Sequence, residues 1–129
     1  MKTGQKIEIY AGENTEVSYP VVEMAEDEKP VNSVVRESVA TRTGAGAVPL
    51  TSSIVKIVTT GANALTLADG EEGQRISLVM VTDGGDGTLT PANFAGGTTA
   101  TFNDAGDVLE LLFLDGDWHI TLNKGVTIA

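Results

Sequence analysis

Cysteine is absent from the 129-residue chain, which excludes thiol catalysis, disulfide bonds and cysteine-based zinc sites. Aromatic residues are scarce, with three Phe, two Tyr and one Trp, so aliphatic side chains must fill most of the core. We therefore expect partner subunits to help bury apolar surface. No segment approaches the ~20 apolar residues that span a bilayer, and residues 1–10 lack the apolar run of a signal peptide. These absences predict a protein made in a cytoplasm, with no membrane partner.

The chain also has few basic residues. Eight Lys and Arg residues stand against eighteen Asp and Glu residues, which gives a net charge of −10. The summed field of such a chain repels phosphate backbones, so nucleic acid is not expected as a partner. High acidity also keeps a protein in solution at high local concentration, as a surface component present in many copies must be.

Sequence motifs of common catalytic and cofactor sites are missing. His119 is the only histidine, and no motif accompanies it, so a packed or surface position on a strand is favoured over a catalytic one. Gly84-Gly85-Asp86-Gly87 has no second copy and no closing Glu, which favours a turn over a calcium loop. Gly44 and Gly46 are followed by Pro49 where a dinucleotide fingerprint needs glycine. We expect no enzyme activity, cofactor or metal.

Residues 1–47 are expected to form an N-terminal arm and a connection, and residues 48–129 a β domain. Two alternating runs, 6–10 and 16–21, have the period of extended strands. A charged stretch follows and stops at Pro30, while residues 31–39 fit helix spacing but consist largely of β-branched valines, so their state stays open. Small residues in 41–47 indicate a flexible connection.

From residue 50 onward, strand-like runs recur at the spacing of about 8 to 12 residues that is typical of sandwiches and barrels. Turn sequences rich in Gly, Asp and Asn separate them. This pattern predicts a mainly β fold, a small antiparallel sandwich or compact barrel with an extended N-terminal arm. The expected strands are 53–59, 64–67, 75–82, 88–90, 98–102, 107–114, 117–122 and 126–128.

The last hairpin permits a prediction of register. If Asp115-Gly116 is a two-residue turn, Phe113 faces Trp118, Leu111 faces Ile120 and Leu109 faces Leu122, so six large apolar residues share one face. The opposite face is mixed, and packing of that face against a neighbour is a hypothesis. It carries Glu110, Leu112, Leu114, His119 and Thr121.

Several pieces of residues 48–122 arrive in an order that resembles a β module of bacteriophage virion proteins. They are the run 57–70, Glu72-Gly73-Gln74, Thr90-Pro91, Gly106-Asp107 and 115–118. Such modules occur in capsid decoration or head-fibre proteins and in tail-associated fibres. Because most of these pieces are turns and core positions, the resemblance speaks to fold and particle more than to a binding site.

The resemblance implies a non-enzymatic virion structural protein, expected on the capsid surface as a decoration protein. Its expected partners are the major capsid protein and further copies of itself, in a homotrimer. Apolar residues of the arm could add strands to a neighbour's sheet edge, and two arginines beside the connection could contact an acidic partner. The candidate interface residues are Ile7, Ile9, Tyr10, Val17, Tyr19, Arg36 and Arg42.

Two other functions are kept as alternatives. The same module in a tail fibre or baseplate would contact host glycans or other tail proteins, although one Trp and two Tyr offer few rings to stack on sugars. A small hydrolase that uses two carboxylates is disfavoured, because eighteen acids make chance pairs inevitable.

Overall fold

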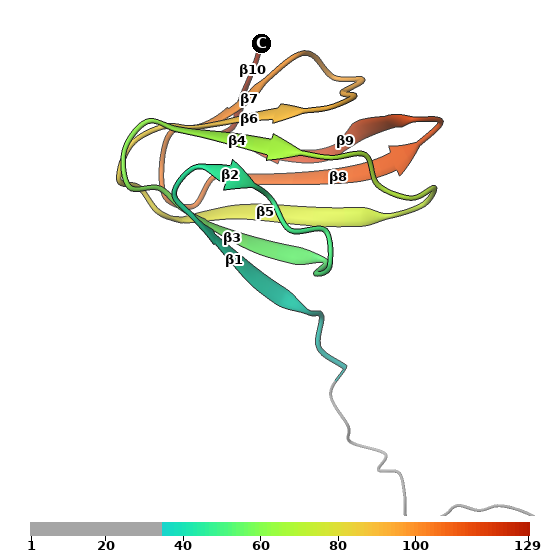
Figure 1. Ribbon diagram of the computed structural model, residues 1–129, viewed down its shortest axis with the longest axis horizontal. Coiled ribbons are helices and arrows are strands. Elements are labelled where there is room, and N and C mark those ends of the chain that lie inside the picture. Colours follow the sequence, from blue (N-terminus) through green and yellow to red (C-terminus); the bar gives the residue numbers. More distant parts are fainter. Residues whose placement is uncertain (1–34) are drawn as a thin grey trace, which may run out of the picture. The chain divides into compact units, whose positions relative to one another are not determined.

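The computed structural model describes residues 35–129. The chain divides into two units, Met1–Arg36 and Glu37–Ala129. We call Glu37–Ala129 the β unit, and Figure 1 shows it as two stacked layers of strands. The strands expected within residues 6–10 and 16–21 lie outside the described residues.

The β unit contains ten strands, and no helix occurs among residues 35–129 that could cross a membrane. Eight of the expected runs from residue 53 onward each match an observed strand to within a few residues. The strands are β1 (Val39–Thr43), β2 (Gly46–Ala47), β3 (Ile54–Val58), β4 (Asn63–Leu67), β5 (Arg75–Thr82), β6 (Gly87–Pro91), β7 (Ala100–Phe102), β8 (Val108–Leu114), β9 (Asp117–Lys124) and β10 (Thr127–Ile128).

The strands form two five-stranded sheets. The first sheet has the order β1-β3-β5-β8-β9, and the second has the order β10-β7-β6-β4-β2 (Figure 1). The mainly β class and the two-layered sandwich are confirmed, and the sheets do not close into a barrel. Both sheets are mixed, whereas the sequence predicted antiparallel pairing.

Parallel pairing comes from the path of the first six strands. Successive strands lie alternately in the first and the second sheet. The chain therefore returns to the same sheet with every second strand, and each time it runs in the same direction. As a result β1, β3 and β5 pair in parallel, as do β2, β4 and β6. The last four strands pair antiparallel. A single-sequence pattern marks strands but leaves no local trace of their partners, which explains the difference from the prediction.

The compact fold begins before the expected boundary at residue 48. Residues 39–47, expected to belong to the N-terminal arm and connection, contain β1 and β2, which pair with β3 and β4. The short Gly44–Ala45 corner between them carries the chain from one sheet to the other, and Gly44 has a positive φ of 72°. Small residues in this stretch thus serve a tight corner instead of a linker.

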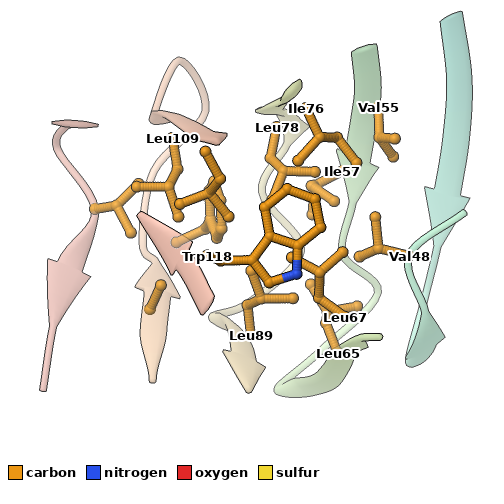
Figure 2. Close-up of a cluster of buried hydrophobic side chains, with 14 of the residues drawn as sticks. Val48, Val55, Ile57, Leu65, Leu67, Ile76, Leu78, Leu89, Leu109 and Trp118 are labelled. Atoms are coloured by element: carbon orange, nitrogen blue, oxygen red, sulfur yellow. The ribbon is translucent and has the colours of Figure 1, made fainter. Parts of the chain in front are cut away.

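The core lies between the two sheets (Figure 2). Alternate residues of β3, β5 and β8 are buried, which is the period of a strand with one face on the core. Trp118 is fully buried, packs edge-on against Phe113 at a centroid distance of 5.1 Å, and donates from Nε1 to the Ala68 carbonyl at 3.0 Å. Because Ala68 follows β4, this bond links the two sheets.

The β8–β9 hairpin turns at Asp115-Gly116, as predicted. Both residues have positive φ, 52° and 83°, as a type I′ turn requires. The predicted pairs hold from the turn to Leu111, which faces Ile120. A β-bulge then shifts the register, so Leu109 faces Asn123 and Leu122 faces Glu110. The prediction that Leu122 joins the core face is therefore wrong, because the extra residue turns it outward.

Candidate functional site

The structure describes two of the seven predicted interface residues. Ile7, Ile9, Tyr10, Val17 and Tyr19 lie outside the described residues, so the predicted strand addition by the arm stays a prediction. Arg36 is exposed and is the last residue before the β unit. Arg42 lies on the edge strand β1.

Arg42 connects the two edge strands at the start of the β unit. Ala40 and Arg42 alternate with the exposed residues of β1, so both face the inner side of the first sheet. The Arg42 guanidinium donates to the carbonyls of Thr43 at 3.0 Å and Ala47 at 3.3 Å. Its Nε is buried and has no hydrogen-bond partner among the described atoms. Arg42 thus holds the β1–β2 corner, and an inward-pointing charge also discourages strand addition at an edge.

The Gly-rich stretch 83–87 is a tightly bonded turn between β5 and β6. The Thr59 hydroxyl accepts from the Gly84 amide at 2.9 Å and donates to the Gly85 carbonyl at 2.7 Å. The Asp83 carboxylate accepts from the Gly85 amide at 3.1 Å. These bonds give the Asp and Gly residues a structural role. Within residues 35–129, no group of three or more His, Asp and Glu side chains is arranged to hold a metal ion.

A shallow depression of about 620 Å³ lies at the β4–β5 loop, lined by Leu50 and residues 69–74. Two of its three acidic side chains, those of Asp69 and Glu72, form local hydrogen bonds. Asp69 accepts from Asn93 Nδ2 at 2.9 Å, and Glu72 accepts from the Asp115 amide at 3.0 Å. The Gln74 side chain accepts from the Glu71 amide at 2.9 Å and donates to the Leu50 carbonyl at 3.2 Å. The depression is thus a well-ordered loop junction with an acidic rim.

His119 lies on the outer side of the hairpin, opposite Leu112, as predicted. It is exposed, and its Nε2 lies 3.2 Å from the Leu114 carbonyl. The expectation of a packed or surface position on a strand agrees with this placement, and the expectation that His119 is not catalytic stays a prediction.

The outer face of the first sheet carries most of the exposed large hydrophobic residues among the described residues. Four of the five exposed large hydrophobic residues lie on it: Val39 at 53%, Val81 at 44%, Leu114 at 37% and Leu122 at 44% exposure. Further half-buried aliphatic residues fill the space between them. We call this surface the aliphatic face, and define it by Val39, Ile54, Val58, Val79, Val81, Val108, Leu112, Leu114 and Leu122.

Basic residues are concentrated on the same face. The β unit has four Lys and Arg residues against eleven Asp and Glu residues. Lys56, Arg75 and Lys124 are exposed at outward positions of β3, β5 and β9, and the acids on this face are Glu110 and Asp117. Lys124 reaches the Gly106 carbonyl at 3.5 Å. The bulge in β9 turns Leu122 and Lys124 outward together, since these residues pair with Glu110 and Val108.

The outer face of the second sheet differs in composition. One row across the strands runs through Ala64, Thr88, Thr101 and Thr127, and a second row runs through Ala47, Thr66 and Thr90. We call this surface the threonine face. It carries no charged side chain and no large hydrophobic residue at these positions, and threonine is well suited to an exposed strand.

No protein-family model matches the chain, and a search of curated proteins finds no match. The resemblance to phage virion proteins therefore stays a prediction that depends on the sequence pieces named above. The function has to be argued from the surfaces of the chain itself.

Part of the aliphatic face was predictable from the sequence. The mixed outer side of the hairpin was visible from its period-2 pattern. Its extension over β1, β3 and β5 was not, because strand order places those residues beside the hairpin. The available signal was the near-continuous apolar character of Ile54–Val58 and Arg75–Thr82, which indicates strands that contact protein on both sides.

Proposed function

We propose that the chain is a non-enzymatic structural protein of a bacteriophage virion, a capsid decoration protein that binds the outer shell and stabilises it. The observation that carries the proposal is the aliphatic face, because a small acidic domain that exposes large hydrophobic residues on one sheet is built to pack against protein. The resemblance of residues 48–122 supplies the kind of particle.

In this proposal the mechanism is mechanical. Each copy contacts adjacent copies of the major capsid protein, and the buried interface adds free energy that opposes rearrangement of the shell. The stabilisation grows with occupancy. Met1–Arg36, outside the β unit, supplies the attachment segment, and its alternating apolar residues suit pairing with a neighbour's sheet edge.

A binding assay with empty capsids of the encoding phage, stripped of surface proteins, tests the proposal. Purified protein is mixed with the capsids and sedimented, and bound copies per particle are counted. We expect saturable binding at a number set by capsid symmetry, with a rise in the melting temperature of the shell. A variant without residues 1–30 should lose binding. Absence of binding by the full chain would contradict the decoration function.

One observation favours a tail fibre or baseplate module as the second candidate. The parallel coils β1–β2, β3–β4 and β5–β6 stack along one direction, as in elongated solenoid domains. The same preparation mixed with purified tails distinguishes the candidates, because a tail module would sediment with tails and leave capsids bare.

A further inference from the structure

The aliphatic face combines two properties that are absent from the other outer face. All four exposed large hydrophobic residues of the β unit are gathered on it, whereas Val35, the fifth among the described residues, precedes the unit. Large aliphatic side chains that remain exposed together on one surface indicate a contact with another protein. The face spans five adjacent strands, about 19 Å across at the usual spacing of about 4.8 Å, so a flat protein surface fits it better than a small ligand.

Charge then restricts the partner. The face holds three of the four basic residues of the β unit and two of its eleven acids, Glu110 and Asp117. Two such faces in direct contact would bring six cations against four acids, which leaves unpaired positive charge in the contact and is unfavourable. A surface with excess acid is therefore required, and the loops of the β unit provide one, because outside the aliphatic face the unit has nine acids and one base. The threonine face is neutral, the loops carry the remaining acids, and residues 13–28 contain six acids and no base.

We propose that the aliphatic face binds an acidic surface of a second copy of this chain, in a head-to-tail contact that joins copies into a closed ring. Unlike surfaces meet in such a contact, so each copy uses its aliphatic face once and its acidic surface once. The cations fix the orientation, and the aliphatic side chains supply buried area. The contact requires no capsid, so its test is independent of the proposed decoration function.

The assembly state of the full chain tests the proposal. Sedimentation velocity over a range of concentrations should show an oligomer for the unaltered protein. Leu122→Asp replaces one of the exposed leucines of the contact by a charge and should raise the dissociation constant at least tenfold. Thr127→Asp is the matched control, because Thr127 is exposed on an edge strand of the second sheet, and it should leave assembly unchanged. A monomeric wild type, or equal loss in both variants, would overturn the proposal.

Charge reversal provides a second test that does not disturb packing. Lys56 and Lys124 are exposed, so Lys56→Glu with Lys124→Glu should keep the circular dichroism spectrum and weaken assembly at least tenfold at low salt. Lysine substitutions at Glu71 and Glu72, on the acidic rim of the β4–β5 loop, should restore assembly of the reversed protein. Unchanged assembly after reversal of both lysines would exclude the cations from the interface and contradict the head-to-tail contact.

Discussion

The two outer faces of the sandwich are both formed by five-stranded sheets, but they carry different side chains. Both are flat surfaces of five-stranded sheets, and both consist largely of β-branched residues. The aliphatic face consists largely of valine and isoleucine, and lysine and arginine lie between them. The threonine face consists of rows of threonine and alanine. Valine and threonine have nearly the same shape and both favour strands, so fold requirements alone do not separate them.

The difference therefore reflects what each face contacts. A hydroxyl group is satisfied by water and keeps a sheet surface wetted, whereas an exposed methyl group is stabilised only when another apolar surface covers it. The β-bulge in β9 strengthens the contrast, because it adds Leu122 and Lys124 to the aliphatic face at the cost of a regular ladder. Both faces are supported by the same core between the sheets. A substitution that destabilises this core should therefore affect both faces and have the largest effect.

Trp118→Ala should have the largest effect. Trp118 is fully buried, and its Nε1 bond to the Ala68 carbonyl links the sheets whose outer sides are being compared. Loss of the ring should lower the free energy of unfolding by about 3–5 kcal/mol, a large share of the stability of a domain of this size. Urea unfolding followed by circular dichroism measures the loss. Trp118→Phe keeps part of the packing and should cost clearly less; an equal loss would contradict a role for the ring volume.

Gly84→Ala should come second, because it acts where the chain passes from the first sheet to the second. A Cβ at this position would collide with the carbonyl oxygen of Thr59, a backbone atom that cannot move aside easily. We expect a loss of about 2–3 kcal/mol from this overpacking. Gly61→Ala in the neighbouring loop is the control, since nothing lies within 4 Å of its Cβ position. Thermal unfolding of the two variants should separate by many degrees, and similar midpoints would refute the steric explanation.

Many of the strands and the turn of the β8–β9 hairpin were predictable from the alternation of apolar residues and from the residue types of the turns. The alternation of 75–82 and 107–114 gave the buried residues, and Asp115-Gly116 gave both the turn and the register next to it. The bulge beyond Leu111 was not predictable, because an extra residue in one strand is decided by the fit of its side chains against the rest of the sandwich. The parallel pairing of the first six strands was not predicted for a similar reason, since it depends on contacts between strands far apart in sequence.

The surfaces were harder to predict than the core. The sequence located the outer side of the hairpin and singled out Arg42, but it assigned Arg42 to a partner contact or to solvent. In the structure its guanidinium bonds the carbonyls of Thr43 and Ala47, a role that follows from the tight β1–β2 corner. Residues 41–47 were expected to be a flexible connection, because small residues are common to linkers and corners alike.

Arg42→Met tests this corner, where the edges of both sheets meet. Methionine retains the apolar stem and removes the donors to the Thr43 and Ala47 carbonyls, so we expect a loss of about 1 kcal/mol. Hydrogen exchange should report faster opening of β1 and β2, with β8 and β9 unaffected. Arg75→Met, on the exposed outward side of β5, is the matched control and should leave exchange at the corner unchanged.

The smallest effects on stability should come from replacing a valine of the aliphatic face by threonine and a threonine of the other face by valine. These variants test most directly whether the composition of a face decides what it binds. Val79→Thr and Thr90→Val are nearly isosteric changes at outward positions of β5 and β6, so each should alter the free energy of unfolding by about 1 kcal/mol or less. Their effects on assembly should differ, because a hydroxyl on the aliphatic face must lose water when that face is covered. Val79→Thr should weaken assembly several-fold in sedimentation velocity, and Thr90→Val should not. Equal effects would mean that the contrast between the faces has no bearing on which of them binds.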